Sequence, residues 1–126
     1  MEKRRLVAIV DDEKAVCRAI SRLVISAGFE SETFSSGEEF LRSCRERTPD
    51  CLILDLRLPG MNGFQLQQQL ATDHCRIPII LVSAHDDPAS RRQALQSGAF
   101  GFCGKPFDDE ALLEAIHSAM KPGTLK

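Results

Sequence analysis

Five side chains that could act together chemically follow short apolar runs of the sequence. Asp11 and Asp12 follow the first run, Asp55 and Ser83 follow two later runs, and Lys105 follows the last one. If the runs are parallel strands, these side chains meet at the carboxyl edge of one sheet, where ligands bind in such proteins. Three carboxylates placed this close repel one another and need a cation or a base nearby to stay ionised. Because Mg²⁺ prefers oxygen ligands and accepts phosphate oxygens, the set predicts a Mg²⁺ site at which a carboxylate takes up a phosphoryl group.

Each of the five residues alone is also typical of an ordinary polar strand end, so the positions of the strands matter. Branched apolar residues fill residues 6–10, 51–54 and 77–82, which predicts strands buried on both faces. Residues 29–34 alternate between apolar and polar side chains, which favours a strand at the sheet edge, and residues 99–104 predict a short last strand.

Helical patterns separate these strands. The predicted helices cover residues 16–27, 36–44, 62–72, 87–97 and 108–120. Ser36 and Glu39 predict a capping box at the start of the second helix. The fourth helix has little apolar surface beyond Ala94 and Leu95, so we expect it to pack weakly. Five repeats of strand then helix predict an α/β fold with one parallel sheet, right-handed crossovers and helices on both faces. We expect a single domain over residues 1–126.

Composition and charge limit the classes of function that this chain can have. The chain has 126 residues, with 16 basic and 18 acidic side chains and a net charge of −2, so it has no overall field that attracts nucleic acid or an anionic membrane. Its five cysteines lack a C-x-x-C pair, which argues against a disulfide framework or a zinc site and favours the reducing cytoplasm. The first apolar run is too short for a signal-peptide core or a membrane span.

Four motifs resemble the receiver domain of two-component response regulators over about residues 4–120. They are Val10-Asp11-Asp12-Glu13, Leu54-Asp55 through Gly63, Val82-Ser83-Ala84, and Gly98-Ala99 through Lys105-Pro106-Phe107. The resemblance implies a flavodoxin-like (βα)5 doubly wound sheet with strand order 2-1-3-4-5.

The resemblance also implies site roles. Asp55 is the expected phosphoryl acceptor, taking the group from a phosphohistidine of a sensor histidine kinase or a histidine phosphotransfer protein. Asp12 would bind Mg²⁺ directly and Asp11 mainly through water, while Asp55 and the backbone carbonyl of Arg57 complete the protein ligands. Ser83 and Lys105 would each bind a phosphoryl oxygen.

Further positions carry expectations from the same resemblance. The Lys105–Pro106 peptide bond would be cis. Phe102 falls at the position of a switch aromatic, and a static core phenylalanine is the alternative. Arg57 and His85, two residues beyond Asp55 and Ser83, would tune how long the phosphoryl group lasts, although His85 also fits an exposed loop histidine.

The expected function is a phosphorylatable signalling module whose only catalysis is its own phosphotransfer and autodephosphorylation. One alternative is a degenerate receiver that binds partners without phosphorylation. Another is a Mg²⁺-dependent aspartyl-phosphate phosphatase of the haloacid-dehalogenase-like kind. That enzyme needs a second aspartate as general acid two residues after the nucleophile, and here Arg57 occupies the position.

The output is expected to pass through protein contact. With the sequence ending shortly after the last helix, the target is either a downstream protein or a missing C-terminal effector domain. We expect the fourth helix, fifth strand and fifth helix to form the contact surface, with dimerisation there on phosphorylation as a further possibility.

Overall fold

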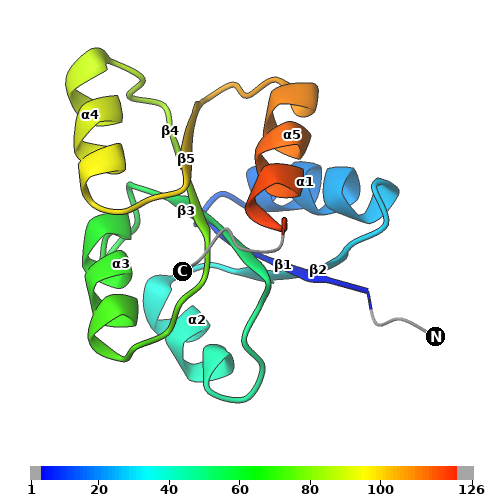
Figure 1. The fold of residues 1–126 in the computed structure, drawn as a ribbon, viewed down its shortest axis with the longest axis horizontal. Helices are drawn as coiled ribbons and strands as arrows, with labels where there is room; N and C mark the ends of the chain where they lie inside the picture. Colours follow the sequence, from blue (N-terminus) through cyan, green and yellow to red (C-terminus); the bar gives the residue numbers. More distant parts are fainter. Residues whose placement is uncertain (1–3, 122–126) are drawn as a thin grey trace.

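Strands and helices alternate along the part of the chain, residues 4–121, that the computed structural model describes (Figure 1). The ends of the predicted domain, residues 1–3 and 122–126, lie outside the described residues. The elements are β1 (Leu6–Val10), α1 (Lys14–Ser26), β2 (Glu30–Phe34), α2 (Gly37–Cys44), β3 (Cys51–Asp55), α3 (Gly63–Thr72), β4 (Ile79–Ser83), α4 (Pro88–Gln96), β5 (Gly101–Gly104) and α5 (Asp109–Ala119). None of the helices in this described part combines the length and apolar character that a membrane span requires.

The five strands form one parallel sheet in the order β2-β1-β3-β4-β5. This confirms the flavodoxin-like order and places β2 at an edge of the sheet. Parallel neighbours need a crossover between them, and the helices supply it. The order matters for the site because it makes β1 and β3 direct neighbours at the centre.

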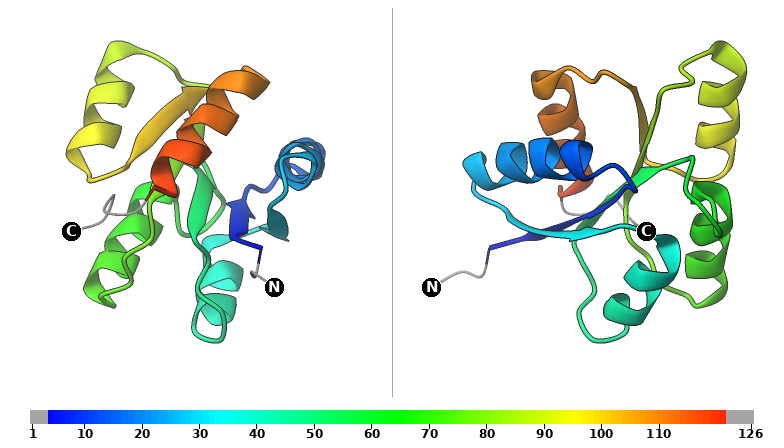
Figure 2. Two further views of the ribbon diagram at one scale, coloured as in Figure 1. Left: turned by 45° about the vertical axis from the view of Figure 1, so that its right-hand side comes forward. Right: turned by 180° about the vertical axis from the view of Figure 1, so that it is seen from behind.

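Two apolar cores sandwich the sheet, since successive side chains of a strand point to opposite faces. In β1, Val7 and Ile9 pack into a core with α1 and α5, while Ala8 and Val10 pack into a second core with α2, α3 and α4. The views in Figure 2 show the helices divided between the two faces in the same way. Strands buried on both faces hold their polar groups at their ends, where the site forms.

The first helix begins at Lys14, two residues before the predicted start, and the cap of α2 also differs from the sequence prediction. Ser36 accepts a hydrogen bond from the Glu39 backbone N–H (3.1 Å), but the Glu39 carboxylate accepts one from the Ser35 hydroxyl (3.0 Å) in place of closing the expected capping box. Both halves of a capping box are present instead at α3, between Asn62 and Gln65.

Strands β4 and β5 each begin two residues later than predicted, and each delay has a backbone cause. Pro78 has no N–H to pair, so β4 begins at Ile79, although the Pro78 carbonyl accepts from the Leu52 N–H (3.0 Å). Gly98 (φ 95°) turns the chain so that the Ala99 N–H bonds back to Ala94 and ends α4. Residues 98–99 therefore finish the helix, and β5 starts at Gly101.

Helix α4 packs weakly, as the sequence predicts. Ala94 is fully buried, but Leu95 is 58% exposed and contributes little to the core. A partly buried polar contact helps to hold the end of α4, because Gln67 of α3 donates to the Ser97 carbonyl (3.1 Å) and accepts from the Ser97 hydroxyl (3.1 Å).

A close backbone contact behind the end of β3 requires glycine at position 63. A Cβ atom there would lie 2.8 Å from the Asp55 carbonyl oxygen and 2.8 Å from the Leu56 Cα, both backbone atoms with little freedom to move. We therefore expect Gly63→Ala to lower the free energy of unfolding by about 1–3 kcal/mol, measured by urea denaturation. Gly101→Ala is the control, because nothing lies within 4 Å of its added Cβ. Equal stability of the two variants would contradict this assignment.

Candidate metal and phosphoryl site

Three carboxylates gather where β1 and β3 end side by side. Asp11 directly follows β1, and Asp55 is the last residue of β3. One oxygen of each of Asp11, Asp12 and Asp55 lies within 4.8 Å of the others, a spacing that fits a single metal ion. Asp11 and Asp55 are buried, whereas Asp12 is exposed. An oxygen-only set with one side open to solvent suits a hard divalent cation that keeps some of its water.

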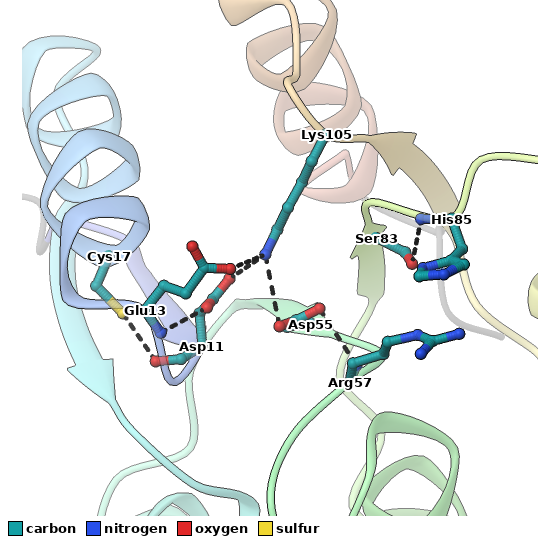
Figure 3. A network of polar contacts seen from close by, with 8 residues as sticks. All are labelled: Asp11, Glu13, Cys17, Asp55, Arg57, Ser83, His85 and Lys105. Carbon is teal, nitrogen blue, oxygen red and sulfur yellow. Dashed lines mark hydrogen bonds and ion pairs between the residues drawn. The ribbon is translucent and has the colours of Figure 1, made fainter.

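The ammonium group of Lys105 lies between the two buried carboxylates (Figure 3). Its Nζ is 2.9 Å from Asp11 Oδ2, 3.5 Å from Asp55 Oδ2 and 3.5 Å from Glu13 Oε1. The backbone positions it, because Gly104 pairs with Ser83 across β4 and β5, and the Lys105 N–H donates to the Ser83 carbonyl (2.8 Å). The peptide bond from Lys105 to Pro106 is cis.

The protonation of this cluster reflects both burial and charge. Burial, followed by the charge of Asp11, raises the pKa of Asp55, and a hydrogen bond from the Arg57 N–H (3.2 Å) and the ammonium of Lys105 offset only part of this rise. Burial disfavours the charged form of Lys105, but its contacts with Asp11 and Asp55 outweigh that effect and raise its pKa. The lysine therefore stays charged, while Asp55 holds its negative charge at a cost.

Ser83 ends β4 beside the carboxylates and is almost fully buried. Its Oγ accepts a hydrogen bond from the His85 N–H (3.0 Å), which fixes the side chain through a lone pair of the oxygen and leaves the hydroxyl hydrogen able to turn toward a ligand. The side chains of Arg57 and His85 are exposed. Figure 3 draws both on the Ser83 side of Asp55.

Phe102 in β5 is neither a fully buried core residue nor a free surface residue. It is half-buried against the core that contains Ala94, and the Arg91 guanidinium lies 5.1 Å from the centre of its ring. Arg91 in turn pairs with Asp86 through two hydrogen bonds, one of them 3.0 Å long. Phe102 thus sits under a cation that connects α4 to the β4–α4 loop.

The structure brings together all five side chains that the sequence pattern singled out, and it adds two contacts that the pattern did not predict. Glu13 is a third acidic neighbour of Lys105. Its position in the acidic run directly after β1 is the sequence feature that could have indicated this contact. The contact of Arg91 with Phe102 joins two elements through long side chains, and the sequence carries no periodic signal for it.

A doubly wound parallel sheet that presents an acidic cluster, a hydroxyl and a lysine at its carboxyl edge defines a flavodoxin-like α/β protein with a candidate metal site. The family model for the response regulator receiver domain matches residues 7–117. The chain therefore belongs to the response regulator receiver domain family, whose members act in signal transduction by two-component systems.

Individual relatives agree with this assignment. The chain is 42% identical over 120 residues to the response regulator protein TodT of Pseudomonas putida strain F1, an alignment that covers 95% of this chain and 53% of TodT. It is 39% identical over 111 residues to the DNA-binding transcriptional regulator NtrC of Escherichia coli K12, covering 87% of this chain and 24% of NtrC. The structure of the response regulator StyR superposes with a TM-score of 0.85 at 41% identity, covering 94% of this chain and 60% of that one. The chain thus spans about half the length of TodT.

The raised pKa of Asp55 predicts a pH-dependent effect of Asp55→Asn on the metal-free protein. A carboxyl group with a higher pKa in the folded state stabilises the fold below its ordinary pKa of 3.8, and this contribution is lost as the pH rises through the folded value. At pH 7, Asp55→Asn should therefore raise the free energy of unfolding by about 1 kcal/mol, and the gain should shrink as the pH falls toward about 4.

Urea denaturation in the presence of a chelator, at the two pH values, measures this effect. Asp50→Asn is the control, because Asp50 accepts a hydrogen bond from the Leu6 N–H (2.8 Å) at the opposite end of the sheet. A loss of stability in Asp55→Asn at pH 7, or a gain independent of pH, would refute the electrostatic assignment.

Proposed function

We propose that this chain is a phosphorylatable signalling receiver. In this proposal residues 1–126 form one domain, and Asp55 accepts a phosphoryl group from a phosphohistidine on a sensor histidine kinase or a histidine phosphotransfer protein, with Mg²⁺ bound. The observation that carries the proposal is the buried Asp55 carboxylate, which lies beside Asp11 and Lys105 at the carboxyl edge of the sheet.

The donor set fits the proposed metal. Asp11, Asp12 and Asp55 offer oxygens within 4.8 Å of one another, and the backbone carbonyl of Arg57, two residues beyond Asp55, is the proposed further ligand. When bound, Mg²⁺ would offset the charge of the carboxylates and of the incoming phosphoryl oxygens. Asp12, which is exposed, is the proposed direct ligand, and Asp11, already bonded to Lys105, is proposed to act mainly through water.

Three side chains of this chain have proposed roles in the transfer of the phosphoryl group. A carboxylate oxygen of Asp55 attacks the phosphorus atom, and the bond from phosphorus to the histidine nitrogen breaks with its electron pair leaving on the imidazole. Lys105 would give up part of its contact with Asp55 to pair with a phosphoryl oxygen. Ser83 would donate its hydroxyl hydrogen to another, while its oxygen still accepts from the His85 N–H.

The proposed response to phosphorylation starts at Ser83. Its movement toward the phosphoryl group would pull the β4–α4 loop, which holds Asp86 and thereby Arg91 above Phe102. The surface of α4, β5 and α5, where Leu95 and Phe100 are exposed, is the proposed contact surface for a downstream protein or a second copy of the domain. The phosphoryl signal would thus leave through a change in packing around Phe102, which has no hydroxyl of its own to exchange between partners.

Catalysis by this chain is proposed to stop at its own phosphotransfer and autodephosphorylation. Arg57 occupies the position of the general acid that a turnover phosphatase needs, so a leaving alkoxide would find no proton donor there. Arg57 and His85 are instead proposed to affect the approach of water to the acyl phosphate. An unchanged rate of phosphoryl loss in both Arg57→Ala and His85→Ala would remove this role.

The relatives suggest where the signal goes. The name of NtrC describes a DNA-binding transcriptional regulator, and this chain matches 24% of its length. We propose that the output lies in a C-terminal effector domain of this kind or in a separate downstream protein, and that the receiver itself does not contact nucleic acid. The cysteine pattern favours the cytoplasm as the compartment.

Intact mass spectrometry after incubation with Mg²⁺ and acetyl phosphate tests the proposal. We expect the native chain to gain one phosphoryl group, because Asp55 is a buried carboxylate held beside both Lys105 and the carboxylates of Asp11 and Asp12. The gain should require Mg²⁺ and should be absent in Asp55→Asn. Asp50→Asn, which changes a carboxylate remote from the site, should gain the group like the native chain.

Each other outcome has a definite meaning. Failure of the native chain to gain mass would favour the degenerate receiver that binds partners without phosphorylation. Continuous release of phosphate when a phosphate ester replaces acetyl phosphate, without a stable adduct, would favour the phosphatase. A gain that persists in Asp55→Asn would place the acceptor elsewhere.

A further inference from the structure

Two cysteine thiols touch at the end of the molecule opposite the phosphoryl site. Cys44 is the last residue of α2, and Cys75 lies in the connection from α3 to β4. Their Sγ atoms are 3.6 Å apart, although the residues are 31 positions apart in the sequence. The contact belongs to none of the roles assigned above.

The end of α3 determines the position of Cys75. His74 adopts a left-handed backbone conformation (φ 57°), and the chain reverses there. The His74 N–H then bonds to the Ala71 carbonyl (3.1 Å) and the Cys75 N–H to the Leu70 carbonyl (2.8 Å), which are the two hydrogen bonds of a Schellman motif. This motif turns Cys75 back onto the core that contains Leu70 and Cys44.

The two thiols differ in exposure. Cys44 is buried, and burial, followed by its hydrogen bond with Cys75, raises the pKa of the Cys44 thiol to about 11. Cys75 is half-buried and stands between the exposed residues His74 and Arg76. A small solute therefore reaches Cys75 first, with Cys44 directly behind it.

The remaining cysteines have other surroundings. The Cys17 thiol donates to the Asp11 carbonyl (3.3 Å), and Cys51 is fully buried in β3. Cys103 in β5 is half-buried like Cys75 and lies beside Arg91 and Asp86. Cys103 is therefore a control of matched exposure for Cys75.

From this arrangement we infer that Cys44 and Cys75 form an oxidant-responsive dithiol site, which hydrogen peroxide converts into a disulfide between α2 and the α3–β4 connection. In the first step the Cys75 sulfur takes an oxygen atom from hydrogen peroxide, which gives a sulfenic acid and one water. In the second step the Cys44 sulfur attacks the Cys75 sulfur, the S–O bond breaks, and a second water leaves with the thiol proton of Cys44. Two thiols and one peroxide thus give one disulfide and two waters, and a dithiol reductant reverses the change.

Bond formation needs only a small movement. A disulfide has an S–S length of about 2.05 Å, so the two sulfur atoms must approach by about 1.5 Å from their present separation. The residues around both thiols, Arg45, Glu46, His74 and Arg76, are exposed, so the ends of α2 and α3 can shift without disturbing the sheet. The site is far from Asp55 along the strands and does not depend on phosphorylation.

Counting thiols after oxidation tests the inference. The native chain is treated with hydrogen peroxide, unfolded and alkylated, and its mass is measured by mass spectrometry. We expect three alkylated thiols in place of the five free cysteines of the reduced chain, a peptide that links Cys44 to Cys75, and a return to full alkylation after dithiothreitol. Asp55→Asn should lose the same two thiols, so failure of the phosphorylation proposal leaves this result unaffected.

Matched variants separate the pair from general oxidation. Cys103→Ser should still lose two thiols, whereas Cys75→Ser should lose none to an internal disulfide. Cys44→Ala, which removes the buried thiol, should likewise form no internal disulfide. If Cys44→Ala fails to fold, Cys75→Ser with a normal melting curve still tests the pair. Full alkylation of the oxidised native chain, an unchanged loss in Cys75→Ser, or a disulfide only between two chains would overturn the inference.

Discussion

The ammonium of Lys105 between the buried carboxylates of Asp11 and Asp55 is the interaction on which the carboxyl edge of the sheet depends. Loss of the Lys105 ammonium would leave two buried carboxylates uncompensated, and leaving a buried charge without its partner typically costs about 3–5 kcal/mol. Here one ammonium serves two buried carboxylates and the nearby Glu13, so the site keeps an excess of negative charge. That excess is what a divalent cation or a cationic partner would neutralise. Burial, followed by the charge of Asp11, raises the pKa of Asp55.

The sheet topology makes this charge arrangement possible. Strands β1 and β3 lie side by side at the centre and end together, which brings Asp11 next to Asp55. The pairing of Ser83 with Gly104 brings Lys105 to the same edge. Gly63 permits the chain to pass close behind the Asp55 carbonyl. Because apolar cores cover both faces of β1, β3 and β4, the polar side chains at this edge lie at or just beyond the ends of these strands. The Cys44–Cys75 contact lies at the opposite end of the molecule.

Much of this was predictable from the sequence, and the exceptions have physical causes. The apolar runs and helix caps predicted all ten elements, and the residues at the strand ends predicted the acidic cluster. Proline at 78 and the helix-ending turn at Gly98 shortened two strands, since hydrogen bonding and not hydropathy sets where a strand begins. The weak packing predicted for α4 is confirmed, because Leu95 is largely exposed. The contacts of Arg91 with Phe102 and of Cys44 with Cys75 join distant segments without any periodic pattern, so only the structure reveals them.

Asp55 carries its negative charge at a cost that a bound cation would relieve. Carbon-13 NMR of the aspartate carboxyl carbons, titrated with pH in the metal-free protein and again with saturating Mg²⁺, tests it most directly. We predict that Asp55 titrates above its ordinary pKa of 3.8 without metal, and that Mg²⁺ lowers this pKa because the cation favours the charged carboxylate. An Asp55 that titrates at or below its ordinary value without metal, or that does not respond to Mg²⁺, would contradict the claim.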